Sequence, residues 1–499
     1  MGDGTARTLG ALFEGLEVTW QRCGPETPVA RVTLEPAEAG PGDLCVLQPR
    51  FHGDDFLPSP LPPAVLVTTP ELPVPPEHPA VVLVGSTADM GVFADRYFGH
   101  PARRLRLAGI TGTNGKTTTT WLVSAMLEAA GRVYTRMGTL GHRVAGKPSP
   151  LGFTSPFHFP LQTLLAQTVE AGGTDVIMEV SSHALAQQRL QPVQLDAVGM
   201  TNLAWDHIDC HGSHDAYRDA KLLLPQRHLK RDGVAVAFVD EQPACEAFLR
   251  LARAHGARAW RASRDPSSDA EIRVTRVREG STPTRWLLDV ETPCGLLPVV
   301  LPLEGTHNVE NALVAIGLGL GLGLAPETIA RGLAQASAPP GRMTWVSEPG
   351  PERVGVVVDY AHCPRSLEVA IGVARARASG RVKVVAGCGG DRDREKRPPT
   401  GQLLVRLADQ LYATTDNPRF EAPTQIVDDM LSGLTPSQRA EVREIPDRRE
   451  AIERAVAEAA PGDVILIAGK GGESVMLVRG QRLPFRDDDI ALEALSQRP

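Results

Sequence analysis

The chain has 499 residues, a length that predicts roughly three domains. Its 42% hydrophobic and 22% charged residues are close to the averages of globular proteins, which excludes wholesale disorder and a membrane protein. The net charge of −7 gives no basic excess, so neither nucleic acid nor a membrane surface is expected as a partner. The seven cysteines form no CxxC pair, and the N-terminus has no secretory pattern, which together favour free thiols and a cytoplasmic protein.

Residues 1–103 form the first predicted domain, a small α/β or β-rich unit in which proline-rich turns separate short strands. At Arg104 the pattern changes to an apolar strand, a polar glycine turn and a helix closed by Gly131. A strand, a glycine turn and a helix in this order are the beginning of a βα unit.

The central domain is predicted over residues 104–343, and the C-terminal domain over residues 344–499. In the central domain, apolar runs alternate with amphipathic stretches of helical length, which predicts a parallel sheet with helices on both faces. The run Ala312–Ala325 is too short to span a membrane and predicts a buried helix. The alternation restarts in the C-terminal domain, which is predicted to be a second α/β unit. The runs are 175–180, 197–203 and 233–239 in the central domain, and 354–362, 382–390, 409–417 and 462–471 in the C-terminal domain.

The strongest local signal is the run Thr111–Thr118, TGTNGKTT, which follows an apolar strand and opens a helix. Small residues let backbone N–H groups close around phosphate oxygens, and Lys116 supplies a positive charge to the β- and γ-phosphates. The hydroxyl of Thr117 can ligate Mg²⁺. The generic phosphate-loop pattern has glycine five residues before Gly115, where this chain has Ile110. An ordinary glycine-rich turn is the alternative, but Gly-Lys-Thr-Thr at a helix start favours a phosphate site.

Two further residues, Glu179 and His207, are candidates for a metal site beside this loop. Glu179 ends an apolar run and His207 lies in a polar loop, so both could reach a cation beside the phosphates. A solvated loop histidine is the alternative for His207. Lys221 lies in a predicted helix, where a lone lysine is by default a surface residue.

Taken together, these motifs resemble the Mur ligase family, whose ATP-dependent members form amide bonds in peptidoglycan precursor synthesis. Beyond GITGTNGKTTTT, six blocks in order are similar to those of the members that add the third, diamino residue. They occupy residues 178–190, 200–224, 305–315, 357–368, 387–398 and 416–419. The resemblance implies three domains: an N-terminal uridine-nucleotide-binding domain, a central ATPase domain with a parallel sheet and a phosphate loop, and a Rossmann-like C-terminal domain that binds the amino acid.

The resemblance also assigns roles to individual residues. It assigns ATP contacts to Gly112, Thr113, Asn114, Gly115, Lys116, Thr117, Thr118, Asn308, Arg342, Asp359 and His362. It assigns magnesium to Thr117, Glu179, His207 and Lys221, the last as a carbamylated lysine, and these act in catalysis with Lys116. It assigns the UDP-muramoyl-dipeptide to Thr154, Ser155, Ser181, Gln187 and Arg189. It assigns the incoming amino acid to Arg392, Asp416, Asn417, Pro418, Arg419, Gly469 and Glu473.

The reaction implied is the addition of a diamino acid to UDP-N-acetylmuramoyl-L-alanyl-D-glutamate through an acyl phosphate, by a monomer that uses ATP and Mg²⁺. Arg419 favours meso-2,6-diaminopimelate, because a planar guanidinium pairs bidentately with the second carboxylate of that amino acid. L-lysine or L-ornithine is the runner-up acceptor. A Mur-like ligase for a different carboxylate and a non-catalytic nucleotide-binding relative are two further candidate functions.

The chain departs from the family pattern at several places, among them a segment of the N-terminal domain and two single residues. Glu35-Pro36-Ala37 replaces an Asp-Ser-Arg segment of the uridine domain, Gly472 replaces a histidine, and Arg365 replaces an acidic residue. The residue that takes the proton of the attacking amine is not identified by the sequence.

Overall fold

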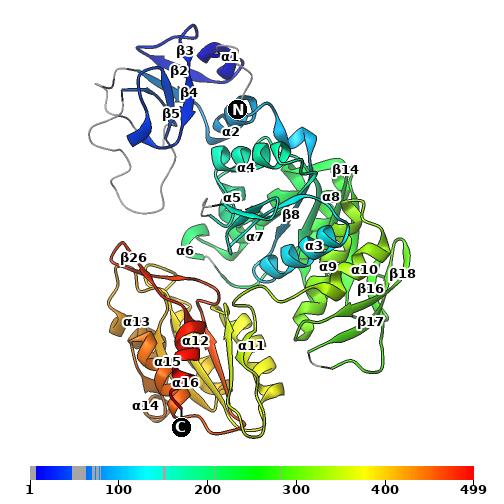
Figure 1. Cartoon of the computed structure of the whole chain (residues 1–499), viewed down its shortest axis with the longest axis vertical. Coiled ribbons are helices and arrows are strands. Elements are labelled where there is room, and N and C mark those ends of the chain that lie inside the picture. The colour runs from blue at the N-terminus through cyan, green and yellow to red at the C-terminus, as the bar shows by residue number, and fades with distance from the viewer. Residues whose placement is uncertain are drawn as a thin grey trace.

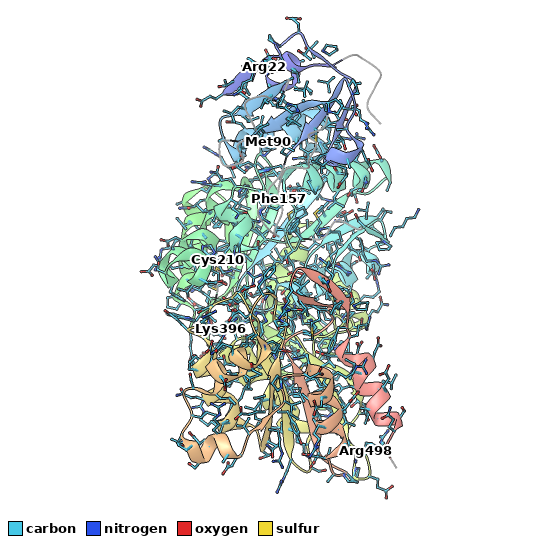
Figure 2. All side chains as sticks on the ribbon, turned by 90° about the vertical axis from the view of Figure 1, so that its left-hand side faces the viewer. Arg22, Met90, Phe157, Cys210, Lys396 and Arg498 are labelled. Atoms are coloured by element: carbon cyan, nitrogen blue, oxygen red, sulfur yellow. The ribbon has the colours of Figure 1, made fainter. Side chains whose placement is uncertain are left out.

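The computed structural model describes residues 7–47, 63–69, 74, 78, 80–149, 153–206, 208–282 and 284–498 of the chain. Three larger sheets follow one another along the sequence, and Figure 1 shows them as three units stacked along the long axis of the molecule. Figure 2 gives the side view, in which the labels run from Arg22 in the first unit to Arg498 in the last. Helices and mostly parallel strands alternate, which confirms the predicted α/β class. The domain boundaries at residues 103 and 343 stay a prediction.

The N-terminal unit is a small sheet with helices packed against it. Its elements are β1 (Arg7–Thr8), α1 (Leu9–Phe13), β2 (Val18–Gln21), β3 (Pro28–Val29), β4 (Arg31–Thr33), η1 (Pro36–Glu38), β5 (Asp43–Val46), β6 (Val65–Thr68), β7 (Val81–Val84), α2 (Thr87–Tyr97) and η2 (Pro101–Arg104). The sheet order is β2-β7-β6-β5-β4, and only the β2–β7 pair is antiparallel. The departing triplet Glu35-Pro36-Ala37 leads into the short helix η1.

The central unit contains an eleven-stranded sheet of order β11-β10-β9-β12-β8-β13-β14-β15-β16-β17-β18. Its strands are β8 (Arg106–Thr111), β9 (Tyr134–Met137), β10 (His142–Val144), β11 (Lys147–Ser149), β12 (Asp175–Glu179), β13 (Leu195–Met200), β14 (Leu229–Phe238), β15 (Arg258–Ser263), β16 (Ile272–Val277), β17 (Trp286–Thr292) and β18 (Gly295–Leu301). The strands from β9 to β16 are parallel, as predicted, but both ends of the sheet are antiparallel. The difference arises because short hairpins, unlike helical crossovers, connect the outermost strands.

Helices cover both faces of this sheet, as the alternating pattern predicts. They are α3 (Lys116–Ala129), α4 (His158–Glu170), α5 (Ser182–Ala186), α6 (Ile208–His211), α7 (His214–Arg227), α8 (Pro243–Ala254), α9 (Thr306–Gly321) and α10 (Pro326–Gln335). One apolar core unites the sheet with α3, α9 and α10, and a second unites it with α4, α5, α7 and α8. The predicted buried helix in the run Ala312–Ala325 is α9, which ends before Gly323, whose φ is +72°. No helix in the described part of the chain is long and apolar enough to cross a bilayer.

The C-terminal unit repeats the α/β arrangement around a six-stranded sheet of order β19-β20-β24-β21-β22-β23. Its elements are β19 (Thr344–Ser347), β20 (Gly355–Asp359), α11 (Pro364–Arg377), β21 (Val382–Cys388), α12 (Arg397–Leu407), β22 (Gln410–Thr415), α13 (Pro423–Leu431), α14 (Pro436–Ala440), β23 (Arg443–Glu444), α15 (Arg448–Ala457), β24 (Val464–Ala468), β25 (Val475–Val478), β26 (Gln481–Pro484) and α16 (Asp487–Ser496). Helices α11, α12 and α13 pack on one face, and α15 and α16 on the other. Because β20, β24, β21 and β22 are parallel, the loops that follow them lie at one edge of the sheet.

Candidate active site

The predicted phosphate loop connects β8 to α3, and glycines allow its sharp turn. The φ angles of Gly112 and Gly115 are +143° and +88°, and a side chain at either position would collide with Thr201 or Asn311. Lys116 is the first residue of α3, and its Nζ donates to the carbonyl oxygens of Gly112 at 2.8 Å and Thr113 at 2.9 Å. The loop therefore surrounds the ammonium of Lys116, which its backbone carbonyls hold in place.

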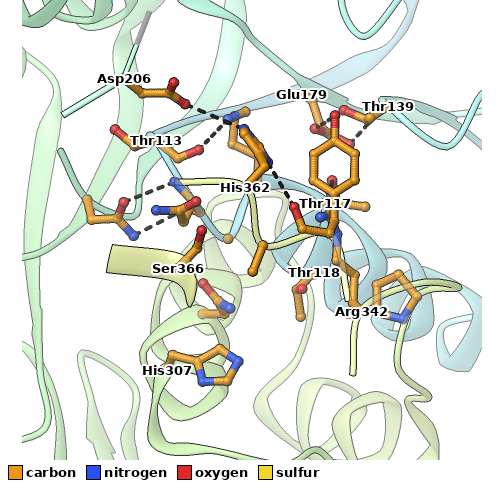
Figure 3. A pocket seen from close by; sticks show the side chains of 18 of the residues that line it. Thr113, Thr117, Thr118, Thr139, Glu179, Asp206, His307, Arg342, His362 and Ser366 are labelled. Carbon is orange, nitrogen blue, oxygen red and sulfur yellow. Dashed lines mark hydrogen bonds and ion pairs between the residues drawn. The ribbon is translucent and has the colours of Figure 1, made fainter. Parts of the chain in front are cut away.

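This loop opens onto a cavity of about 890 Å³ between the central and C-terminal units. Figure 3 shows the side chains of Thr113, Thr117, Thr118, Arg342 and His362 gathered around it. The cavity wall includes most of the residues predicted to contact ATP, which are Thr113, Asn114, Gly115, Lys116, Thr117, Thr118, Asn308, Arg342, Asp359 and His362. Gly112 is not in the wall, and its carbonyl instead accepts from Lys116. Burial is the largest influence on the pKa of Lys116, which it lowers, while Glu179 and Asp206 oppose this effect.

Residues of the C-terminal unit complete the cavity beside the phosphate loop. Arg342 donates from Nη2 to Thr117 Oγ1 at 3.2 Å, and its guanidinium lies 4.0 Å from the ring centroid of Tyr360. The Asp359 carboxylate accepts from the backbone N–H groups of Met343 and Ala361, both at 2.8 Å. Asp359 thus fixes the turn that carries Arg342, so that a guanidinium from the C-terminal unit reaches the beginning of α3.

A second interdomain contact involves Asp206, which the sequence motifs did not single out. His362 Nε2 lies 3.7 Å from Asp206 Oδ2, and Lys396 Nζ lies 3.9 Å from Asp206 Oδ1. The Asp206 side chain is buried. Its place directly before His207 in the polar run WDHID was the available signal. His207 itself lies outside the described residues.

The Glu179 carboxylate lies at the carboxyl end of β12 and is almost completely buried in the cavity wall. It accepts at Oε1 from the backbone N–H of Thr139 and at Oε2 from the Thr139 hydroxyl, both at 3.0 Å (Figure 3). The Thr139 hydroxyl also lies 3.1 Å from that of Thr154. The Thr139 side chain therefore connects Glu179, a predicted metal ligand, with Thr154, a predicted substrate contact.

The residues predicted to contact the dipeptide substrate form a connected group on this wall. The Ser155 hydroxyl donates to the Glu179 carbonyl at 2.9 Å and accepts from the Ser181 N–H at 2.9 Å. Arg189 donates from Nε and Nη2 to Gln187 Oε1, at 2.8 and 2.6 Å, and from Nη1 to the Ser155 carbonyl at 3.1 Å. Burial lowers the pKa of Arg189 to about 10. All five predicted dipeptide contacts, Thr154, Ser155, Ser181, Gln187 and Arg189, line the cavity.

Lys221 is buried, which excludes the default expectation of a surface lysine on α7. Its Nζ donates to the carbonyl of Gly112 at 2.9 Å and lies 4.4 Å from the ring centroid of Tyr217. Desolvation, and then the nearby charge of Lys116, lower the pKa of Lys221 well below its ordinary value. Two lysines thus donate to one carbonyl of the phosphate loop. Among the described residues, no three His, Cys, Asp or Glu side chains gather as a metal cluster.

Most of the predicted amino-acid contacts lie in a cluster next to the cavity, within the C-terminal unit. Asn417 Nδ2 donates to Asp416 Oδ1 and to Glu473 Oε2, both at 2.9 Å. Arg419 Nη1 donates to the carbonyl of Gly390 at 2.8 Å. The cluster comprises Asp416, Asn417, Pro418, Arg419, Gly469 and Glu473, while Arg392 lines the cavity itself. The parallel strands β21, β22 and β24 bring these separate segments to one edge.

The backbone explains one departure from the family pattern. A Cβ at Gly472 would lie 2.8 Å from the carbonyl oxygen of Pro340, and a Cβ at Gly341 would collide with the backbone of Gly472. The two loops touch through their backbones, so a histidine cannot occupy position 472 in this arrangement. Arg365 lines the cavity.

Known proteins similar to this chain identify its family. The profile of the Mur ligase middle domain matches residues 110–319, and that of the Mur ligase glutamate ligase domain matches residues 341–471. A UDP-N-acetylmuramoyl-L-alanyl-D-glutamate–2,6-diaminopimelate ligase from Geobacillus thermodenitrificans is 35% identical, over 98% of this chain and 99% of the relative. A protein of the same name from Thermosynechococcus vestitus is 39% identical, over 92% of each chain. A solved structure of a ligase of that name has a TM-score of 0.63 and 26% identity, with 99% of both chains covered. The chain belongs to the Mur ligase family.

Proposed function

We propose that the chain is an ATP-dependent ligase that joins meso-2,6-diaminopimelate to UDP-N-acetylmuramoyl-L-alanyl-D-glutamate, a step of peptidoglycan precursor synthesis. Relatives that carry this name are similar over almost the whole chain. The observation that carries the proposal is that one cavity joins Lys116, Glu179, Arg189 and Arg392. The phosphate loop, the residues predicted for the dipeptide and one residue predicted for the amino acid therefore line the same cavity.

The reaction would proceed in two steps. The γ-carboxylate of the D-glutamyl residue attacks the γ-phosphorus of ATP, which gives an acyl phosphate and ADP. The amine of the amino acid then attacks the acyl carbon, and the tetrahedral intermediate collapses to the amide with loss of phosphate. No covalent intermediate with the protein is needed, so positioning and electrostatic stabilisation supply the catalysis.

In this scheme Lys116 would exchange its carbonyl partners for phosphate oxygens as ATP enters the loop. The two backbone carbonyls already hold the ammonium of Lys116 at the loop, so little further conformational freedom is lost when it binds phosphate. Phosphate oxygens are the stronger acceptors, because they are charged. Arg342 would add a second cation from the C-terminal unit, beside Thr117. The residues predicted for the nucleotide would thus close around it from two domains.

The donors present fit Mg²⁺, because carboxylate and hydroxyl oxygens are the hard ligands that this ion prefers. Thr117 and Glu179 lie in the same cavity wall, and we propose that both hold the ion. The chemistry supplied by Mg²⁺ at this place is neutralisation of charge on the ATP phosphates. Lys221 would take part as a carbamate, because an ammonium has no lone pair for a metal. His207 keeps its predicted role as a ligand.

The dipeptide would bind along the part of the cavity wall that contains Thr154, Ser155, Ser181, Gln187 and Arg189. Arg189 suits a carboxylate of the substrate, because its guanidinium is desolvated and its bonds within this wall go to the neutral oxygens of Gln187 and Ser155. In the amino-acid cluster, Arg419 would bind the distal carboxylate of diaminopimelate, and Glu473 its ammonium. The predicted cytoplasmic location, monomeric state and domain boundaries stay predictions.

The test is a ligation assay with the full-length protein, Mg²⁺ and ATP. We expect ADP release and a UDP-muramoyl-tripeptide only when both UDP-N-acetylmuramoyl-L-alanyl-D-glutamate and meso-diaminopimelate are present. Faster turnover with L-lysine or L-ornithine would assign another acceptor to the same reaction. ADP release that does not depend on the nucleotide-linked dipeptide would favour another carboxylate substrate, and no release with any pair would favour a nucleotide-binding relative without turnover.

A further inference from the structure

A buried lysine at the centre of the amino-acid cluster has no role in the two-step scheme. Lys470 follows β24 directly after Gly469, and none of its side chain is exposed to solvent. A lysine is almost never fully buried unless its charge is paired, because desolvation of an ammonium is costly. The position of Lys470 therefore requires a specific set of partners.

The ammonium of Lys470 has such a set, which ties the loop after β22 to the segment that follows β24. Its Nζ donates to Asn417 Oδ1 at 3.0 Å, to Glu473 Oε2 at 3.1 Å and to the carbonyl of Val475 at 2.7 Å. An ammonium has three N–H donors, so these three bonds use all of them. Lys470 thus keeps no donor for a ligand, and its effect on a ligand must pass through its neighbours.

These bonds also determine the orientation of the Asn417 carboxamide. Its oxygen accepts from Lys470 and from the Leu477 N–H at 2.9 Å, so its nitrogen must face the carboxylates. That nitrogen donates to Asp416 Oδ1 and Glu473 Oε2. The amide therefore bridges two carboxylates in one fixed arrangement.

The two carboxylates would repel each other without a cation between them. Lys470 Nζ lies 3.1 Å from Glu473 Oε2 and 3.9 Å from Asp416 Oδ1. The hydrogen bonds from Asn417 and Lys470 to the Glu473 carboxylate both end on Oε2, and a third of this side chain is exposed. The oxygen Oε1 is therefore the one available to accept a hydrogen bond from an ammonium.

We propose that Lys470 is a positioning residue for the amino-acid acceptor, which holds Glu473 Oε1 where it accepts the ammonium of the incoming diamino acid. This inference rests on the proposed function. A charge with no contact to any substrate thus sets the affinity for one of the three substrates only. The Val475 bond extends the same network to β25, whose Leu477 carbonyl accepts from the N–H of Arg419 at 2.9 Å.

The test compares full-length Lys470→Met with wild type in the ligation assay, with each substrate varied in turn. We expect KM for meso-diaminopimelate to rise about tenfold to a hundredfold, the usual consequence of a misplaced binding group, while KM for ATP and for the nucleotide-linked dipeptide stays within about twofold. Lys383→Met is the matched control, because Lys383 is another buried lysine of this unit whose partners, Glu458 and Asp463, lie outside the cluster. The control is expected to lose stability without a selective change in KM.

Equal KM values for the diamino acid in wild type and Lys470→Met would overturn the inference, and so would a uniform rise in all three KM values. If the wild type itself forms no tripeptide, the proposed function fails instead, and the two failures are thus distinguishable.

A second pair keeps the inference testable where Lys470→Met does not fold. Glu473→Gln alone removes the carboxylate through which Lys470 acts, and Lys470→Met/Glu473→Gln removes both charges together. We expect these two variants to share one raised KM for the diamino acid. A double variant that is a further tenfold worse would contradict an action through Glu473.

Discussion

Two lysines in this molecule, for which opposite roles are proposed, differ in their partners. Lys116 lines the cavity and donates to two carbonyls of its own loop, whereas Lys470 is fully buried and donates to an amide of the loop after β22 and to a carboxylate and a carbonyl a few residues further along its own segment. A cation with weak neutral partners can exchange them for a ligand's anion. A cation with a compensating carboxylate cannot leave without exposing an unpaired buried charge. The partners of a buried or half-buried cation therefore indicate whether it can bind a ligand or can only hold neighbouring side chains in position.

The largest effect is expected at the phosphate loop. Lys116→Ala removes the charge that would neutralise the transferred phosphate, so kcat should fall about a thousandfold with little change in thermal stability. Steady-state kinetics and a thermal melt measure the two quantities. A loss of thermal stability that accounts for the whole loss of activity would show that Lys116 is a structural cation instead.

Lys221 provides an intermediate case, since it shares the Gly112 carbonyl with Lys116 but is predicted to act as an anion. Carbamylation would replace a repulsive pair of cations by an attractive pair of opposite charges. Lys221→Ala should lower kcat about three hundredfold, and millimolar short carboxylates should restore part of it. Lys116→Ala should gain nothing from them. Full activity of Lys221→Ala in carbon dioxide-free buffer would return Lys221 to a purely structural role.

Arg419 should determine which acceptor is selected. Arg419→Ala is expected to lower kcat/KM for meso-diaminopimelate about a hundredfold, because the distal carboxylate loses its guanidinium partner, and to affect L-lysine far less. The exposed Arg482 on β26 supplies the matched control, and Arg482→Ala should change neither value. Unchanged selectivity in Arg419→Ala would show that another residue recognises the acceptor.

The smallest effect concerns stability and its dependence on pH. Hydrogen bonds from the buried Arg397 lower the pKa of Glu421 to about 2. Because the pKa is depressed in the folded state, the stabilisation is complete above about pH 4.5 and is lost as the pH falls through about 2. Glu421→Gln should therefore cost about 2 kcal/mol at neutral pH and flatten the fall in Tm between about pH 4.5 and 2.

The control for this pair is Glu453→Gln on α15, where the glutamate is half exposed. An exposed ion pair contributes little, so its Tm profile should follow that of wild type. A wild-type Tm that does not fall between about pH 4.5 and 2 would contradict the role of the Arg397–Glu421 pair.

Much of the fold and part of the site could be predicted from contiguous residues. The phosphate loop is one such part, because a strand, two glycines with positive φ and a helix start are decided within a short stretch of chain. The apolar runs that predict β12 and β24 are equally local, since strands covered on both faces need apolar residues throughout. The blocks that identify the Mur ligase family are short for the same reason.

The remaining features depend on contacts between segments far apart in the sequence. In the sequence Lys470 is one lysine in a glycine-rich turn, and only the approach of the loop after β22 brings Asn417 to Lys470 and Glu473. Arg342 reaches the distant Thr117 only because the two units face each other across the cavity. The sequence by itself determined several of the parallel strands, the phosphate loop and the family. The tertiary structure decided the burial and the partners of each cation, because both depend on neighbours that no local pattern specifies.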